Sequence, residues 1–146
     1  MRDHVRFRSA AFTPADVEPG QVNRERYGYT LASWVAARLT ERGFVPDAPA
    51  PDDWGWLLGV VQDGRVVRIG CGNVEGSVSE WLIFVDVDRP GLLARLSGRG
   101  AVMPNAVYGI VAAIHGALQA SGHAEEIEWF RVDSRGQELD HGATPI

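Results

Sequence analysis

The chain has 146 residues, a formal net charge of −5, 45% hydrophobic residues and one cysteine. This length predicts a single domain over residues 1–146 that buries roughly 70% of the surface its unfolded chain would expose. All 14 basic residues are arginines, which excludes chemistry that depends on lysine, such as a Schiff base or a P-loop lysine. The acidic balance argues against binding to nucleic acid or to anionic membranes.

The N-terminus and the lone cysteine indicate a compartment. Residues 1–8 lack the apolar segment of a secretory signal, and no apolar run approaches the ~18 residues that cross a bilayer. Cys71 has no second cysteine with which to form an internal disulfide, which fits a reducing environment. We therefore expect a cytoplasmic protein that does not bind membranes.

The first third of the chain predicts one strand and one helix. Residues 4–12 alternate between apolar and polar side chains, which is typical of a strand with one face in water. Residues 13–26 carry two prolines and a glycine, so we expect a loop. The spacing of apolar residues then predicts a helix over 28–42, and the proline-rich residues 44–53 predict an extended connector.

A β-hairpin is the strongest signal in the chain. Two apolar runs, 54–62 and 65–73, flank Asp63-Gly64, a dipeptide that favours a two-residue hairpin turn. A strand, a helix and a strand follow, over residues 81–87, 104–121 and 126–132. From about residue 134 we expect a polar, frayed tail. The order β-α-β-β-β-α-β predicts a two-layer α+β sandwich, in which two helices cover one face of a mostly antiparallel five-stranded sheet.

Several short motifs occur in order along the chain. They are PGQVN ending at Asn23, YGYTLASW ending at Trp34, DWGW beginning at Asp53 and GCGN beginning at Gly70. Together these motifs resemble those of a group of small bacterial proteins to which no activity is attached. The resemblance implies a shared fold and a bacterial source, and it transfers no catalytic residue.

The predicted hairpin register divides the side chains between two faces. Counting outward from the turn places bulky apolar residues, Trp54 and Trp56 among them, on one face that we expect to hold the helices. The other face, the glycine face, carries four glycines around Arg68: Gly55, Gly59, Gly70 and Gly72. Because glycine weakens a strand, three explanations stay open. A helix packs closely there, the glycines relieve twist beside large tryptophans, or the face is an open groove for a partner.

The glycine face is the first candidate for function. If the strand over 81–87 continues the pattern, Leu57, Val66, Leu82 and Phe84 surround Arg68 as an apolar patch typical of an interaction surface. We therefore expect a non-enzymatic module that binds a protein partner here. By analogy of fold, its acidity suits an immunity-type or inhibitor-type protein that masks a basic effector. The free chain is expected to be a monomer or a homodimer.

A ligand site or active site at the mouth of the hairpin is the alternative. Asp52, Asp53 and Trp54 are consecutive there, and carboxylates at a strand end suit acid–base chemistry. Arg38 lies in the apolar stripe of the first predicted helix, where its side chain either meets a buried carboxylate or extends to the surface. This reading makes the protein a small enzyme or a ligand-binding domain.

Other chemistry receives little support from the sequence. Cys71 and His115 have the residue types of a nucleophilic pair, yet Cys71 falls on the apolar hairpin face, where a buried cysteine behaves as a small hydrophobe. Asp86 and Asp88 end a strand, but no histidine or further ligand stands at a metal-binding spacing. We therefore expect no metal, no cofactor and no catalytic residue.

Overall fold

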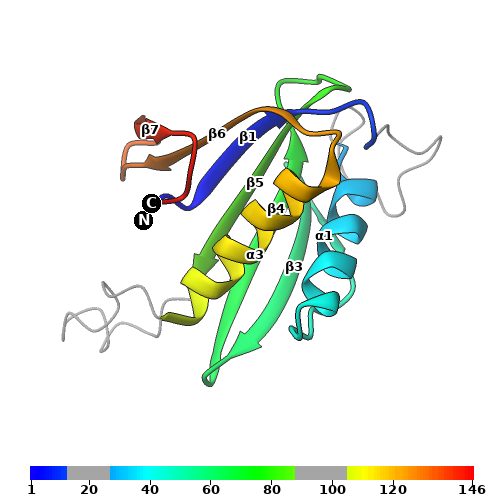
Figure 1. Cartoon of the computed structure of the whole chain (residues 1–146), viewed down its shortest axis with the longest axis vertical. Coiled ribbons are helices and arrows are strands. Elements are labelled where there is room, and N and C mark those ends of the chain that lie inside the picture. The colour runs from blue at the N-terminus through cyan, green and yellow to red at the C-terminus, as the bar shows by residue number, and fades with distance from the viewer. Residues whose placement is uncertain (13–26, 88–104) are drawn as a thin grey trace.

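The computed structural model describes residues 1–12, 27–87 and 105–146. These ranges form one antiparallel sheet of seven strands, with two helices packed side by side on one of its faces (Figure 1). The strands lie in the order β2-β3-β4-β5-β1-β6-β7. In chain order the elements are β1 His4–Arg8, α1 Tyr29–Glu41, β2 Ala50–Asp52, β3 Gly55–Gln62, β4 Arg65–Asn73, β5 Glu80–Val87, α3 Asn105–Ser121, β6 Glu125–Val132 and β7 Glu138–Gly142.

The β3–β4 hairpin has the register that the sequence predicts. Trp56 pairs with Cys71, and Val61 pairs with Val66. The backbone φ angles of Asp63 and Gly64 are 50° and 74°. A two-residue hairpin turn of type I′ needs positive φ at both central residues, because only then does its twist match that of the strands. The α+β class and the antiparallel sheet are confirmed.

The prediction of five strands is wrong, because the sheet has two further edge strands. β2 lies inside the expected connector, where Pro51 pairs with Trp56 at the edge of the sheet. An edge strand tolerates proline, which has no N–H to donate to a neighbour. The first strand is also shorter than expected, since β1 ends at Arg8 and not at residue 12.

The tail is the second departure from the prediction, since residues 138–142 form β7 against β6. The β6–β7 connection is a built turn, in which the Asp133 carboxylate accepts hydrogen bonds from the backbone N–H groups of Arg135 and Gln137. The Arg2 side chain donates to the carbonyl oxygens of Asp140 and Thr144, so the two ends of the chain lie together (Figure 1). A polar tail therefore becomes ordered by pairing and not by burial.

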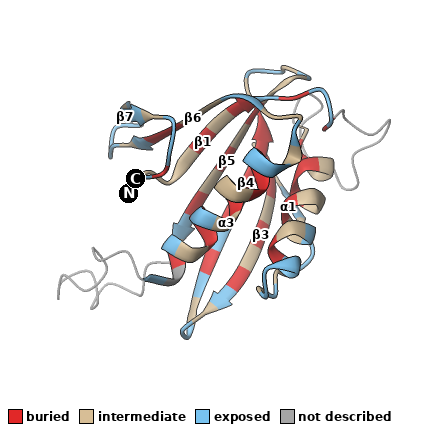
Figure 2. Ribbon diagram, in the orientation of Figure 1, coloured by how far each residue is buried: buried red, intermediate tan, exposed pale blue. Residues whose placement is uncertain are grey.

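The core lies between the sheet and the helices. Figure 2 shows the buried residues on the strands beneath α1 and α3, while the turns are exposed. Alternate residues of β1, β3, β4 and β5 point into this layer, as the two-residue period of a strand requires. The central contributors are Val5, Phe7, Leu58, Ile69, Trp81 and Ile83 from the sheet, and Leu31, Val35, Leu39, Ile110, Ile114 and Leu118 from the helices.

Candidate functional site

The glycine face is the side of the sheet away from α1 and α3, and aromatic rings lie on it. The rings of Trp54 and Phe84 stand over Gly70, where an added Cβ atom would overlap both. A Cβ atom at Gly72 would lie 2.8 Å from the Trp54 carbonyl oxygen. The glycines therefore admit side chains and backbone of the same chain, and the close helix considered for this face is absent from the described ranges.

Gly59 has a different neighbour on the same face. The Asp47 carboxylate accepts a 2.6 Å hydrogen bond from the Gly59 N–H, and a Cβ atom there would lie 2.8 Å from the Asp47 Oδ2. Asp47 precedes β2, so this contact holds the connector against the edge of the sheet. Each of these three glycines thus makes room for a defined group.

The side chain of Trp54 departs from its expected position. The hairpin count placed it on the apolar face, but its ring lies on the glycine face, 4.8 Å from the ring of Phe84 between centroids. β3 begins at Gly55, so Trp54 belongs to the β2–β3 turn, where the alternation of a strand does not apply. This turn brings a large ring over the bare backbone of β4.

Trp54 begins a row of five rings that crosses the sheet. Successive ring centroids are 4.8 Å, 5.5 Å, 5.5 Å and 5.4 Å apart. The row runs from the β2–β3 turn through β5, β1 and β6 to β7, and consists of Trp54, Phe84, His4, Phe130 and His141. Of these five residues, sequence reasoning placed only Phe84 on this face, because the others come from a turn and from strands distant in sequence.

A hollow of about 170 Å³ opens beside Trp54. We call it the Trp54 hollow. Its lining residues are Trp54, Gly72, Asn73, Leu82 and Phe84. The buried Asn73 side chain is held on both sides, since its Oδ1 accepts from the Tyr27 N–H and its Nδ2 donates to the Ser77 carbonyl, each at 3.0 Å. The hollow is therefore lined mainly by apolar groups, beside a strand end that the Asn73 side chain holds in place.

The expected patch residues do share the glycine face. Leu57, Leu82 and Phe84 are partly buried, whereas Val66 is 36% exposed and its cross-strand partner Val61 is 68% exposed. Arg68 is exposed and stands opposite Asp86 in the β4–β5 register. The patch thus extends from the Trp54 hollow to the tip of the hairpin.

The residues of the alternative site are not brought together. Arg38 lies on the helical side of the sheet, where its Nη2 donates to Glu41 at 2.6 Å and its guanidinium lies 5.9 Å from the Trp34 ring. Asp53 is exposed, and the Asp52 Oδ1 accepts a 2.6 Å hydrogen bond from the Asp53 N–H. The aspartates thus stabilise their own turn, and Arg38 takes its carboxylate partner from α1.

Cys71 and His115 occupy separate structural roles. Cys71 is fully buried, and burial raises the pKa of its thiol, which favours the unreactive protonated form. His115 accepts a 3.0 Å hydrogen bond at Nδ1 from the indole N–H of Trp129. Burial lowers the pKa of His115. The neutral imidazole of His115 accepts this hydrogen bond and thereby holds the Trp129 side chain in the core.

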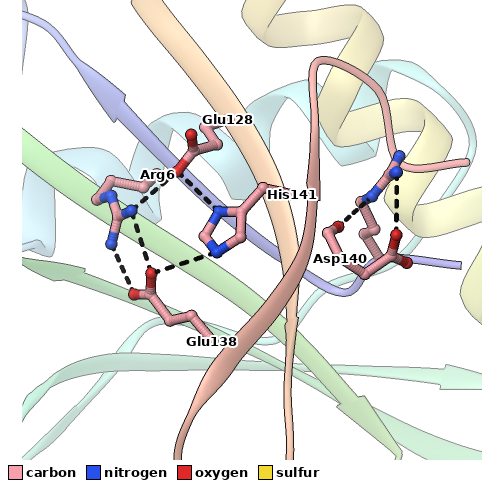
Figure 3. A network of polar contacts seen from close by, with 6 residues as sticks. Arg6, Glu128, Glu138, Asp140 and His141 are labelled. Atoms are coloured by element: carbon pink, nitrogen blue, oxygen red, sulfur yellow. Dashed lines mark hydrogen bonds and ion pairs between the residues drawn. The ribbon is translucent and has the colours of Figure 1, made fainter.

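A polar network surrounds His141, the last residue of the ring row (Figure 3). Arg6 donates to Glu138 at 2.6 Å and to Glu128 at 2.9 Å, and the His141 Nδ1 lies 3.0 Å from Glu128. The hydrogen bond to Glu138 raises the pKa of Arg6, and those from His141 and Arg6 lower the pKa of Glu128. Arg6 also covers the Phe130 ring at 5.1 Å. The network thereby ties β7 to β1 and β6.

The described residues contain neither a metal-binding cluster nor a helix that could span a membrane. No group of three or more His, Cys, Asp or Glu side chains stands close enough to hold a metal ion in residues 1–12, 27–87 and 105–146. Neither helix of these ranges has the length and apolarity needed to cross a bilayer. Comparison with known protein families, curated proteins and solved structures also finds no match to the chain.

Proposed function

We propose that the protein is a non-enzymatic binding module whose glycine face receives an apolar side chain of a protein partner in the Trp54 hollow. The hollow itself is the observation that carries this proposal. It is lined by Trp54, Leu82 and Phe84 and lies on the face of the sheet that α1 and α3 leave uncovered. Interfaces take much of their binding energy from a few apolar anchors seated in such pockets.

The size of the hollow suits a single side chain. An apolar cavity of about 150 Å³ holds a benzene-sized ring, and the Trp54 hollow measures about 170 Å³. One aliphatic or aromatic side chain fills that space. Val61 and Val66, which are exposed at the tip of the same hairpin, add apolar surface farther along this face.

The charged residues near the hollow favour one class of partner. Asp52 and Asp53 precede Trp54 directly, and Asp86 follows two residues after Phe84, within a chain of net charge −5. Complementary charge speeds encounter and disfavours wrong partners. A segment with an apolar anchor flanked by basic residues fits this rim. The partner class that we favour is a basic effector, masked as an immunity-type or inhibitor-type protein would mask it.

Peptide display on the immobilised full chain tests this function. Peptides that bind are expected to share an apolar residue flanked by arginine or lysine. Leu82→Asp is expected to lower the affinity for the selected peptides by about tenfold or more, because it places a charge in the anchor site. Arg68→Glu is expected to strengthen the binding of these basic peptides without unfolding the chain, because it replaces an exposed positive charge on the glycine face by a negative one.

Tyr108→Ser is the matched control, because Tyr108 is 46% exposed on α3, on the other side of the sheet. It is expected to leave the affinity unchanged. Circular dichroism and the unfolding temperature verify that each variant is folded. Selected peptides that bind wild type and folded Leu82→Asp equally well would contradict the proposal.

A further inference from the structure

A second hollow, of about 380 Å³, lies on the helical side of the molecule, at the C-terminal ends of α1 and α3. Trp34, Arg38 and Arg42 line it from α1 and its cap, and Ser121 and His123 line it from the end of α3 and beyond. Ala117 and Ala120 form the α3 wall. Their short side chains leave the space open, and we call it the helix-end hollow.

Basic nitrogen atoms outnumber carboxylates around the helix-end hollow. Glu41 is the acidic residue of the lining, and it bonds to Arg38 Nη2. The Arg42 guanidinium has one hydrogen bond, to the Arg38 carbonyl at 3.4 Å, and no carboxylate of the described residues lies within ion-pair distance of it. One wall of the hollow therefore carries more positive than negative charge.

Two buried nitrogen atoms of the lining residues lack a partner. Arg38 Nε and His123 Nδ1 are buried and have no hydrogen-bond partner among the described residues. Buried polar atoms in native proteins are nearly always paired, and an exception calls for an explanation such as a bound water or ion. Both residues line the helix-end hollow, so a ligand bound there would lie beside the two side chains that carry these atoms.

Ordinary helix chemistry explains part of this arrangement. Arginine near a helix C-terminus offsets the partial negative charge of the last carbonyls, and the stem of Arg38 covers apolar surface between the helices. Neither effect supplies a partner for Arg38 Nε or for His123 Nδ1. Neither effect brings the imidazole and the two guanidinium groups to one space.

The size and the walls of the hollow indicate an organic anion. Its volume lies in the range of about 300–1,000 Å³ found for small-molecule sites, which is more than a bare ion needs. Guanidinium groups match the oxygen geometry of phosphate, and the Trp34 indole offers a flat wall for a planar group. We propose that the helix-end hollow binds a small organic phosphate, with its phosphoryl group on Arg38 and Arg42 and its body against Trp34.

Phenyl phosphate is the probe for this site, and phenol is its neutral counterpart. In an NMR titration of the full chain, phenyl phosphate is expected to produce saturable shifts of the Trp34 indole N–H and of the His123 signals. Phenol is expected to shift neither. Arg42→Gln is expected to weaken phenyl phosphate about tenfold, because it removes a charge-assisted hydrogen bond. Arg65→Gln, at the start of β4, is the control and leaves the affinity unchanged.

Glu41→Gln gives a change of opposite sign. It removes the carboxylate that competes for Arg38, so phenyl phosphate is expected to bind more tightly. If the ion pair were merely structural, its loss would not increase the affinity for phenyl phosphate. Equal shifts by phenol and phenyl phosphate would overturn the proposal. Equal weakening by Arg42→Gln and Arg65→Gln would reduce it to general surface charge and overturn it as well. Tighter binding of benzoate than of phenyl phosphate would overturn the assignment to phosphate.

Discussion

The ring of Trp54 lies 4.8 Å from the ring of Phe84, and both rings stand over Gly70. This contact joins the β2–β3 turn to the middle of the sheet, and the missing side chain at Gly70 makes it possible. The two rings are tilted against each other, and both line the Trp54 hollow. A glycine in the centre of a strand is therefore part of the proposed binding surface.

Gly70→Ala should lower the free energy of unfolding by about 1–3 kcal/mol, as overpacking of a well-filled site does. The new Cβ atom overlaps the rings of Trp54 and Phe84, so at least one ring or the strand must shift to make room for it. Urea unfolding followed by tryptophan fluorescence measures the change. An unchanged free energy of unfolding would show that the two rings do not pack on Gly70.

Gly109→Ala should shift stability in the other direction. Gly109 lies inside α3, and the nearest atom to an added Cβ is Phe44 Cζ at 3.7 Å, an ordinary contact. Alanine in a helix interior is more favourable than glycine by about 0.5–1 kcal/mol. Gly109→Ala is thus expected to raise the unfolding temperature in the same assay. A loss of stability comparable to that of Gly70→Ala would contradict the difference between the two sites.

The His115–Trp129 contact predicts a pH dependence of stability. Burial lowers the pKa of His115 in the folded state below its ordinary value of 6.5. The unfolded chain then binds a proton first as pH falls, so acidification from about pH 7.5 to about pH 5.5 destabilises the fold. His115→Gln should lose less stability than wild type over this range. Parallel pH profiles for the two proteins would contradict a neutral His115 in the folded state.

The Arg6 network should contribute little stability, and in a definite pH range. Its groups are partly exposed, so Arg6→Gln is expected to cost about 1 kcal/mol or less at neutral pH. The pKa of Glu128 is lowered in the fold, so its contribution is present above its ordinary value of 4.5 and is lost as pH falls through the folded value. Chemical unfolding at neutral and acidic pH measures this, and a cost that grows on acidification would contradict the ion pairs.

Cys71 should resist alkylation while the chain is folded. It is fully buried, and burial raises the pKa of its thiol, so both access and thiolate are lacking. Mass spectrometry after iodoacetamide treatment is expected to show unmodified protein in buffer and one modification in denaturant. Rapid modification of the folded protein would contradict the burial of Cys71 beneath the helices.

The sequence predicts the centre of this sheet well and its edges poorly. Asp63-Gly64 and the alternation of the flanking residues determine the β3–β4 register, because a shift by one residue would turn every apolar side chain to the other face. β2 and β7 have no such signal. They are three and five residues long. Each forms a strand because it pairs with a neighbour, β2 with β3 and β7 with β6, and such pairing leaves no pattern in the local sequence.

The candidate site could be predicted only in part for the same reason. The patch around Arg68 follows from alternation within β3, β4 and β5. The ring of Trp54 lies outside a strand, so alternation assigns it to the wrong face. His4, Phe84 and Phe130 become neighbours because β1 inserts between β5 and β6, and this strand order is a property of the whole fold.

The Trp54 hollow as an anchor site is tested most directly by intermolecular nuclear Overhauser effects in a complex with a selected peptide. With the chain labelled at leucine methyl groups and aromatic rings, an apolar peptide side chain is predicted to give contacts to the Leu82 methyl groups, the Trp54 indole and the Phe84 ring. Contacts to α1 and α3, with none to Leu82 or Trp54, would contradict the glycine face as the binding surface.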